Sequence, residues 1–390
     1  MLHDINTTPL ALYVHWPYCL SKCPYCDFNS HVADSIDIDA FTRAYKKELD
    51  FYASATPRRP LHSIFFGGGT PSLMPPKLVQ DIIDYARDLF GLEQGCEITL
   101  EANPTSFETE KFKAFKDAGV NRVSLGVQSL YADDLKFLGR QHSAEDAIAA
   151  ITSAQKIFDR FSFDLIYARP EQSIAAWEAE LKQALDYGTT HLSLYQLTIE
   201  QGTAFFTQHK RGDFRLPDEF LAADLYETTQ ALTASYNLPS YETSNHAAMG
   251  EESRHNLVYW RYFDYIGIGP GAHGRYTDHH GQKIASRAHL APEKWLSLCA
   301  ENPHGAHPFE RIDADSSFTE SVMMGLRLKE GINLEGLAAR LGTNWADQIS
   351  TDKINMLVRE DLITFDADTQ IRATNSGALC INSLLNVLLN

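Results

Sequence analysis

Three cysteines lie close together near the start of the chain. Cys19, Cys23 and Cys26 follow an apolar run that ends at Trp16, with the spacing C-x3-C-x2-C. Thiolates are good ligands for iron, and three of them on one short loop can hold three corners of a cubane cluster while the fourth iron stays open. A structural zinc site or a disulfide is the alternative, but zinc sites normally supply four protein ligands. The spacing therefore predicts an iron–sulfur cluster with one open coordination position.

A glycine run follows the second apolar stretch of the chain. Gly67, Gly68 and Gly69 come directly after residues 63–66, which read as a buried strand, and Thr70 follows them. Consecutive glycines let the backbone approach a ligand closely and leave its donors and acceptors free. Alone, the run is equally consistent with a tight loop. Its place one strand–helix unit after the cysteines favours a ligand site.

The cysteine spacing resembles the signature of the radical S-adenosylmethionine (SAM) superfamily. The resemblance implies a [4Fe-4S] cluster on the three cysteines, with the methionine part of SAM chelating the open iron. One electron from the cluster would then cleave the sulfonium, and the 5′-deoxyadenosyl radical would abstract hydrogen, so that the cofactors supply chemistry which the protein positions and shields. The resemblance also implies that the glycine run, with Gly68, Gly69 and Thr70, binds the methionine amino group.

Further polar and aromatic residues match SAM contacts of this superfamily. Glu101 ends the third predicted strand, where a carboxylate can accept both ribose hydroxyls; a solvated strand-end carboxylate is the alternative. Tyr25 is implied to lie beside the adenine ring. The remaining implied contacts are Tyr13, Gln128, Arg140 and Asp164. Each residue alone is as well explained by a structural role, and their shared placement around the strands is what indicates a site.

Four strings narrow the resemblance further. They are YVHWP at 13–17, CPYCDFNS at 23–30, GVQS at 126–129 and YIGIGPGAHG at 265–274. Together they resemble oxygen-independent coproporphyrinogen III dehydrogenases and their relatives, the HemW-type haem chaperones. The dehydrogenases carry a further cysteine two positions after the third, where this chain has Phe28, and a longer segment before the position of Tyr13. Both departures favour the haem chaperones.

Residues 255–260, HNLVYW, match the H-N-x-x-Y-W haem-binding motif of those chaperones. Imidazole is a good axial ligand for haem iron, so the match predicts that His255 binds haem. Arg254 and Arg261 flank the motif, and we expect one or both to pair with haem propionates, which an acidic chain otherwise attracts poorly. A hydrogen-bonded histidine in a packed loop is the alternative for His255. His273 is left unassigned.

The elements that position these residues read as alternating strands and helices. Strands are predicted at 10–16, 63–66, 97–101, 122–127, 161–167 and 191–197, and helices at 40–52, 77–89, 109–118, 144–158 and 174–187. This rhythm is typical of an α/β fold with a parallel sheet, either doubly wound or a barrel. The resemblance favours a partial (β/α)6 barrel. In either fold, ligands bind at the carboxyl ends of the strands.

Three regions divide the chain. Residues 1–240 are predicted as the radical SAM barrel with the cluster and SAM sites, 241–310 as a connecting region with the haem motif, and 311–390 as a smaller, mostly helical domain. The last domain reads as helices at 318–328, 334–341 and 352–360, a hairpin around 365–369 and a final apolar helix, an order that resembles a winged helix. DNA binding is disfavoured because the hairpin carries Asp366 and Asp368.

Composition limits the partners. The chain has 390 residues with 44% hydrophobic content and a formal charge of −17, which is typical of a soluble globular protein and argues against a nucleic-acid partner. No stretch reads as a signal peptide or a transmembrane helix, so we expect a cytoplasmic protein. Cys96, Cys299 and Cys380 are scattered along the chain and are expected to be small buried hydrophobes.

Three functions remain open. In the first, the protein is a haem chaperone that transfers haem to acceptor haemoproteins, respiratory enzymes among them, while the cluster and SAM modulate binding or assembly. In the second, it decarboxylates the propionates of coproporphyrinogen III. In the third, it is a radical enzyme acting on another substrate, with a structural His255. Phe28 and the haem motif favour the first; the oligomeric state, a homodimer included, and productive SAM cleavage stay open.

Overall fold

Six parallel strands form the centre of the fold. The structure, a computed structural model, describes residues 8–367 and 369–389. The strands are β1 (Leu10–Trp16), β2 (Leu61–Gly68), β3 (Leu92–Ala102), β4 (Arg122–Gln128), β5 (Arg160–Tyr167) and β6 (His191–Gln196). Each pairs in parallel with the next along the chain. The predicted parallel sheet is confirmed, with β2 and β3 longer than expected.

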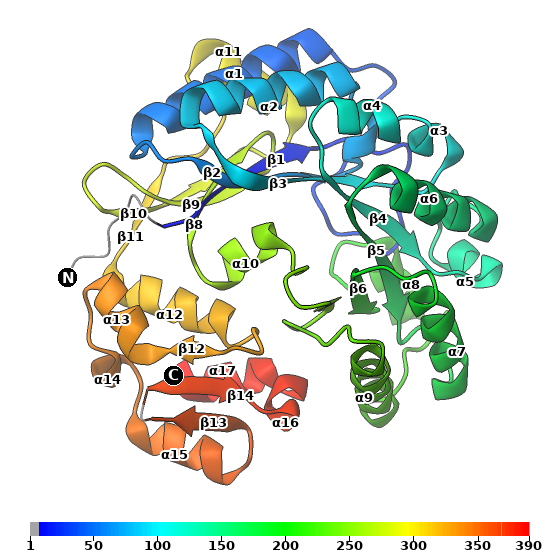
Figure 1. Cartoon of the computed structure of the whole chain (residues 1–390), viewed down its shortest axis with the longest axis vertical. Helices are drawn as coiled ribbons and strands as arrows, with labels where there is room; N and C mark the ends of the chain where they lie inside the picture. Colours follow the sequence, from blue (N-terminus) through cyan, green and yellow to red (C-terminus); the bar gives the residue numbers. More distant parts are fainter. Residues whose placement is uncertain (1–7, 368, 390) are drawn as a thin grey trace.

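Helices cover the outer face of these strands. They are α1 (Ile38–Ala55), α2 (Pro76–Phe90), α3 (Ser106–Thr109), α4 (Phe112–Asp117), α5 (Ala132–Phe137), α6 (Ala144–Ile157), α7 (Ile174–Leu185), α8 (Ala204–Arg211) and α9 (Glu219–Ser235), with a short 3-10 turn, η2 (Pro71–Leu73). Figure 1 shows the main helices as an outer arc, with the strands curving inside it. Apolar side chains of both layers merge into one large core. The predicted partial (β/α)6 barrel is confirmed.

One predicted helix is wrong. The single helix expected at 109–118 is two separate short helices, α3 and α4. Glu108 explains the break, because its buried carboxylate accepts hydrogen bonds from the Asn103 backbone amide at 2.9 Å and from the Ser72 hydroxyl. These bonds hold Glu108 in place, and the chain turns at residues 110 and 111 before α4 begins. The periodicity of hydrophobic residues does not reveal a buried carboxylate such as Glu108, so the break could not be predicted from it.

The region 241–310 extends the same sheet on both sides. It holds β7 (Asn245–Ala247), α10 (Arg254–Trp260), β8 (Asp264–Ile268), β9 (His273–Thr277), β10 (Lys283–Arg287), α11 (Pro292–Glu301) and β11 (Glu310–Ile312). β8 pairs in parallel with β1, and β7 pairs antiparallel with β6, so the order is β11-β10-β9-β8-β1-β2-β3-β4-β5-β6-β7. Because α10 lies between β7 and β8 in the chain, it bridges the two sides of the sheet. Figure 1 shows it in the opening of the barrel.

A smaller unit with its own core follows. It contains α12 (Ala314–Gly325), β12 (Ile332–Asn333), α13 (Leu334–Leu341), α14 (Trp345–Gln348), α15 (Thr351–Arg359), β13 (Ile363–Asp366), β14 (Gln370–Ala373), α16 (Asn375–Leu379) and α17 (Ile381–Leu389). The hairpin predicted around 365–369 is confirmed, although Asp368 lies outside the described residues. α12 begins earlier than the predicted helix at 318–328 because the Asp313 side chain caps its N-terminus. The apolar side of α17 packs into this unit's own core.

The two ends of the parallel strands carry different side chains. Gly68, Glu101 and Gln128 lie at or near the carboxyl ends, whereas Ser63 and Arg160 lie near the amino ends. Because the six strands run the same way, each set gathers on one side of the barrel. None of the described helices combines the length and the apolar character needed to cross a membrane.

Candidate functional site

The three cysteines lie on a loop that backbone hydrogen bonds close at its base. The Cys19 amide donates to the carbonyl oxygen of His31 at 2.9 Å, and the His31 amide donates to that of Pro17 at 2.7 Å. Within the loop, the Cys26 amide donates to the Cys23 carbonyl oxygen at 3.2 Å. All three are free thiols, and burial, reinforced by the neighbouring thiols, raises the pKa of Cys19 and Cys26. The three sulfur atoms therefore lie near one another on one ordered loop.

Two side chains donate hydrogen bonds to these sulfur atoms. The Thr70 hydroxyl donates to Sγ of Cys19 at 3.3 Å, and Nη1 of Arg140 donates to Sγ of Cys23 at 3.3 Å. Such donors stabilise the thiolate, the form in which cysteine binds metal. Among the described residues, no three His, Cys, Asp or Glu side chains converge on one metal ion, whereas a cubane cluster spreads its ligands over separate irons. The donor set thus fits an iron–sulfur cluster held by three cysteines.

Asn29 fixes the far side of the cysteine loop to a distant part of the chain. Its Nδ2 donates to the carbonyl oxygens of Pro270 at 2.9 Å and Leu290 at 3.0 Å. Gly271 allows this approach, because its φ is +85° and a Cβ added to it would lie 2.4 Å from Nδ2 of Asn29. Two of the four sequence strings that narrowed the family therefore meet in one contact.

The glycine run packs against the strand that precedes the cysteines. A Cβ at Gly68 would lie 2.6 Å from the His15 ring, and one at Gly69 would lie 2.7 Å from the Tyr18 carbonyl oxygen. The Gly69 amide donates to the Trp16 carbonyl oxygen at 2.7 Å. Glycine is therefore required for this close packing. Binding of the methionine amino group by the run stays a prediction.

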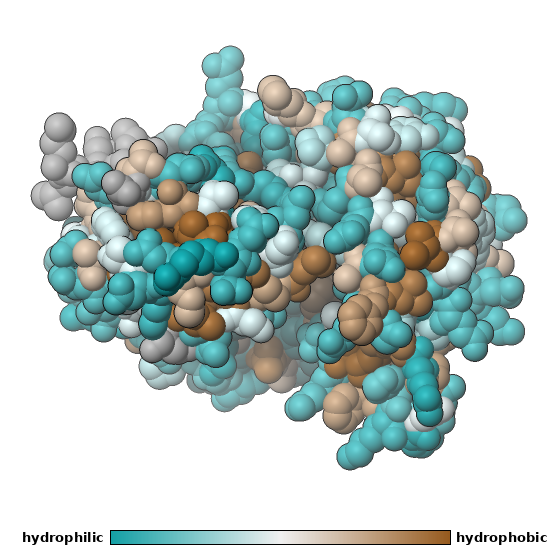
Figure 2. Space-filling model, turned by 90° about the horizontal axis from the view of Figure 1, so that it is seen from below, coloured by the Kyte–Doolittle hydropathy of each residue, from teal (hydrophilic) through white to brown (hydrophobic). Residues whose placement is uncertain are grey.

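A cavity of about 1030 Å³ opens beside the loop at the carboxyl ends of the strands. Its lining includes four of the implied SAM residues, Tyr25, Glu101, Gln128 and Asp164, together with Cys26. Its other walls come from β6, α9 and the C-terminal unit, where α16 and α17 contribute. Figure 2, a view from below, shows the molecule hollowed between the C-terminal unit and the α9 side. The structure thus brings these predicted residues together around one space.

Two carboxyl groups in this cavity hold their protons more tightly than usual. Burial and the nearby charge of Asp164 raise the pKa of Glu101 to about 8, and burial raises the pKa of Asp164 to about 6. The Gly68 amide donates to Oε2 of Glu101 at 3.3 Å, and the Ser124 hydroxyl donates to Oδ1 of Asp164 at 3.4 Å. Near neutral pH, Glu101 can therefore donate one hydrogen bond to a ligand and accept another.

Gln128 reaches the cavity through an unusual backbone conformation. Its φ is +71°, which is rare for a residue with a side chain, and it lies where the pairing of β4 with β5 changes register after Leu125. This irregularity places Gln128 in the cavity lining. Strained residues of this kind cluster at ligand sites, so the geometry favours a binding role.

The other implied SAM residues lie outside the cavity lining. The Tyr13 hydroxyl is hydrogen-bonded with Nδ1 of His15 at 2.9 Å, while Thr70 and Arg140 contact the cysteines. Nη2 of Arg140 donates to Oδ1 of Asn103 at 2.5 Å, and Nδ2 of Asn103 donates to the Thr70 hydroxyl at 3.1 Å. Asn103 thus joins the two, although it was not among the predicted site residues. Its place just after a predicted strand is the signal that could have identified it.

His255 lies at the opposite end of the barrel from the cysteines. It is 1% exposed, and its Nδ1 and Nε2 are hydrogen-bonded with the hydroxyls of Ser63 and Tyr259, each at 2.8 Å. Its ring stacks on Phe65 with the ring centroids 4.9 Å apart. Burial, and more weakly the charge of Arg122, lowers the pKa of His255 to about 3. In this structure His255 is a neutral histidine with both nitrogens occupied, inside the barrel.

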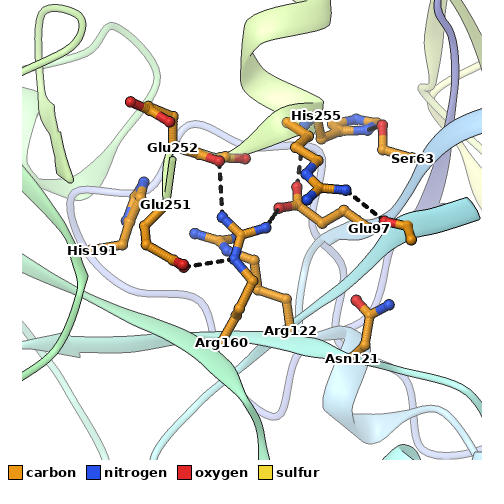
Figure 3. Close-up of polar contacts among 12 residues, drawn as sticks. Ser63, Glu97, Asn121, Arg122, Arg160, His191, Glu251, Glu252 and His255 are labelled. Carbon is orange, nitrogen blue, oxygen red and sulfur yellow. Dashed lines mark hydrogen bonds and ion pairs between the residues drawn. The ribbon is translucent and has the colours of Figure 1, made fainter. Parts of the chain in front are cut away.

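A partly buried ionic network lies beside this histidine, as Figure 3 shows. Arg160 pairs with Glu97 at 2.5 Å and with Glu251 at 2.9 Å. It also donates to the Glu252 carbonyl oxygen at 2.9 Å. Glu97 in turn accepts a hydrogen bond from the His255 backbone amide at 3.2 Å. These contacts fix the first turn of α10 against the amino ends of β3 and β5.

The two arginines that flank the haem motif have partners within the chain. Arg254 donates to the Gly95 carbonyl oxygen at 2.6 Å. Arg261 forms a two-pronged ion pair with Glu330, at 2.7 and 2.9 Å. The expectation that either arginine pairs with haem propionates stays a prediction. For Arg261, it requires that Glu330 be displaced.

Comparisons with known proteins agree with this arrangement. Residues 13–184 match the Radical SAM superfamily, and residues 312–380 match the HemN C-terminal domain. The mitochondrial radical S-adenosyl methionine domain-containing protein 1 of Danio rerio is 38% identical over 83% of this chain and 73% of its own length. The heme chaperone HemW of Escherichia coli is 34% identical over 99% of both chains.

A solved structure shares the fold. Coproporphyrinogen III oxidase (HemN) from Escherichia coli, a radical SAM enzyme, superposes with a TM-score of 0.80 at 21% sequence identity, over 97% of this chain and 90% of that one. At this identity the likeness concerns the fold alone. The sequence relatives carry the assignment, because they span most of both chains. The chain belongs to the radical SAM superfamily, in the group that contains the HemW haem chaperones and their mitochondrial relatives.

Proposed function

We propose that this protein is a haem chaperone that holds a [4Fe-4S] cluster and SAM and transfers haem to acceptor haemoproteins. Relatives named as heme chaperones, which match nearly the whole chain, support this proposal. The observation that carries it is the separation of two sites: the haem motif lies at the amino ends of the strands, and the cysteines and cavity lie at the carboxyl ends. Haem held at the motif would therefore lie away from the cavity in which SAM would bind, as suits a cargo that must leave unchanged.

The cluster and SAM side of the proposal depends on residues that surround the cysteine loop. When bound, the cluster and SAM would supply one-electron cleavage of a sulfonium. Thr70 and Arg140 stabilise two of the sulfur atoms by hydrogen bonds, and Glu101, which lines the cavity, would bind the ribose hydroxyls. The proposed cluster ligands are Cys19, Cys23 and Cys26.

The haem side of the proposal requires a movement of α10. Both ring nitrogens of His255 are occupied, so coordination of iron through Nε2 requires that its hydrogen bond with Tyr259 break. α10 has only seven residues and is followed by Tyr262, whose φ is +53°. Movement of α10 would also break the hydrogen bond from the His255 backbone amide to Glu97. Because the exposed state of His255 must form first, we expect slow association of haem iron with this histidine.

The experiment that tests the haem proposal is a titration of the full-length, anaerobically reconstituted protein with haem. We expect a Soret band whose position changes in His255→Gln, because glutamine keeps the size and hydrogen bonds of the side chain but is a poor ligand for haem iron. His209→Gln, on the exposed side of α8, is the matched control and should behave like the wild type. An identical spectrum for His255→Gln would remove this histidine from the site.

Transfer is a separate claim and needs its own measurement. Haem-loaded protein is mixed with the haem-free form of a respiratory haemoprotein. The acceptor is then separated and examined for bound haem. We expect haem on the acceptor after mixing. Haem that stays on this protein with every acceptor offered would contradict a chaperone. We also propose that the protein acts in the cytoplasm, which fractionation of cells that express it at native levels would test.

A second function, oxidative decarboxylation of coproporphyrinogen III, is favoured by the size of the cavity. Its volume of about 1030 Å³ lies at the upper end of the range for ligand pockets, roughly 300–1,000 Å³, and it adjoins Cys26. The cavity can therefore accept a second molecule beside SAM. Anaerobic incubation with coproporphyrinogen III and SAM, followed by chromatography of the porphyrins, tests this function. Unchanged substrate in a preparation that binds SAM would leave the chaperone as the function.

A further inference from the structure

A second recess lies on the outer side of α10, between this helix and the C-terminal unit. The recess, called here the α10–α13 cleft, has a volume of about 280 Å³. Trp260 and Phe263 line it on one side, and Ile332, Leu337 and Arg340 line it on the other. Most of these side chains are apolar, and two of them are aromatic. The cleft therefore offers a flat ligand an apolar surface with a cationic group beside it.

The charge in this cleft is unusual for so acidic a chain. The chain carries a formal charge of −17, yet among the described residues that line the cleft there is no Asp or Glu. Its two charged side chains are Arg261, which pairs with Glu330, and Arg340. Because the lining carries positive but no negative side chains, the cleft favours an anionic ligand.

Arg340 is the cation available to such a ligand. Both its terminal nitrogens donate to the backbone carbonyl oxygen of Arg261 at 3.2 Å, and its guanidinium lies 5.2 Å from the centre of the Phe263 ring. The carboxylate that acts on Arg340 from a distance is Asp264, which already pairs with Arg59 and Lys283. Among the described residues, no carboxylate forms an ion pair with Arg340 itself. A partly buried guanidinium that is not directly paired with a carboxylate is costly, and a bound carboxylate offsets that cost by a two-pronged hydrogen bond.

We propose that the α10–α13 cleft receives the propionate-bearing edge of haem, with Arg340 binding a propionate and Trp260 and Phe263 covering the adjacent part of the macrocycle. The inference rests on the proposed function and deepens it by naming where haem first binds. A volume of about 280 Å³ is small for a whole ligand, so the cleft holds an edge and leaves the rest of the ring outside. Partial enclosure suits a cargo that must be handed on.

Docking in this cleft is separate from coordination by His255. Trp260 lies five positions after His255 on α10, and at about 100° per residue the two side chains point about 140° apart around the helix axis. His255 contacts the barrel interior, whereas Trp260 lines the cleft. Haem docked in the cleft therefore has no bond to His255 in this conformation of α10. The two sites represent two steps, docking by the propionates and coordination of iron.

Metal-free protoporphyrin IX separates these steps, because it has the propionates but no iron. Its binding to the full-length protein is measured by quenching of tryptophan fluorescence. We expect similar affinity in the wild type and in His255→Gln, and an affinity about tenfold lower in Arg340→Gln, which loses one charge-assisted interaction. Arg359→Gln, an exposed arginine on α15 of the same unit, is the matched control and should bind like the wild type.

Two further measurements keep the test independent of folding defects. The dimethyl ester of protoporphyrin IX, which lacks the negative charges, should bind the wild type about tenfold more weakly than the free acid, and Arg340→Gln should lose this discrimination. Equal affinity of Arg340→Gln and the wild type for the free acid would overturn the cleft assignment. So would a loss of porphyrin binding in His255→Gln alone. If the wild type does not bind haem, the proposed function is wrong. If the wild type and Arg340→Gln bind haem equally well, only the assignment of the cleft is wrong.

Discussion

The two ends of the barrel are built in opposite ways. At the carboxyl ends, Glu101 and Asp164 face a large cavity, and burial raises the pKa of each above its ordinary value. At the amino ends, Arg160 and Glu97 are paired and both nitrogens of His255 are hydrogen-bonded. Polar groups with few partners are ready for a ligand, whereas groups with full partners stabilise the fold without one. The carboxyl ends therefore hold an open cavity lined by buried carboxyl groups, whereas the polar groups at the amino ends are paired with one another.

The largest expected effect concerns the cysteine loop at the carboxyl ends of the strands. Cys23→Ala removes one of three proposed cluster ligands, so we expect loss of the cluster and of SAM binding, because two thiolates cannot hold three corners of a cubane. Iron and sulfide analysis with visible absorbance of anaerobically reconstituted protein measures this. Cys380→Ala is the matched control, since the Cys380 thiol donates to the Ser376 carbonyl oxygen far from the loop in the C-terminal unit. A full cluster in Cys23→Ala would refute the assignment.

The second-largest expected effect concerns the Arg160–Glu97 ion pair at the amino ends of the strands. Arg160→Met leaves the buried carboxylate of Glu97, which is 1% exposed, without its cation, so we expect a loss of about 3–5 kcal/mol in the free energy of unfolding. Urea titration measures it. Arg87→Met is the control, because Arg87 and Asp84 are 49% and 47% exposed and such pairs contribute about 0–1 kcal/mol. Equal losses of unfolding free energy in both variants would mean that the Arg160–Glu97 pair stabilises the fold no more than an exposed pair does.

A smaller effect sharpens the picture of the cysteine loop. Asn29→Ala removes two hydrogen bonds to backbone carbonyls, each contributing about 0.5–1.5 kcal/mol, and so should loosen the loop. We expect faster transfer of cluster iron to an added chelator. Asn302→Ala loses one exposed hydrogen bond, at 3.1 Å to Leu298, and serves as the control. Chelation at the same rate in all three proteins would show that the loop needs no anchor at Asn29.

The smallest effect is a change in pH dependence. Glu101 loses its proton near pH 4.5 when unfolded but keeps it to about pH 8 when folded, so its contribution makes the ligand-free protein less stable as pH rises through this window. Glu101→Gln should flatten that decline in urea titrations between pH 5 and pH 8. Glu335→Gln, an exposed glutamate on α13, should not. The effect is the smallest because Glu101 is only partly buried and lines the cavity, where solvent lowers the cost of its charge.

Local elements were predictable where their signals were local. The strand at 10–16 and the helix at 334–341 match β1 and α13 in full. α13 has an Asn333 cap and a left-handed Gly342 at its end, both readable from neighbouring residues. The break between α3 and α4 was missed because it depends on hydrogen bonds of Glu108 to distant partners. The pairing of β8 with β1 was missed for the same reason, since strand partners leave no trace in local periodicity.

Site residues that lie close together in the sequence were easier to predict than those whose partners are distant in the chain. The cysteine loop could be identified from spacing alone, and the family resemblance supplied Gln128 and Asp164. Asn103 and Asn29 were missed because their partners come from other strands and loops. A motif match also says nothing about exposure, so the burial of His255 appears only when α10 is packed against β2.

The anchor of the cysteine loop has a consequence for how the protein matures. Asn29 bonds to residues 241 and 261 positions later in the chain, so during synthesis at about 5–20 residues per second the cysteines leave the ribosome roughly 10–50 seconds before their final support exists. A cluster inserted in that interval would lie on an open segment exposed to oxidants and chelators. We therefore expect a cluster to be loaded after release of the finished polypeptide, and truncated chains that end before Leu290 to accumulate without iron.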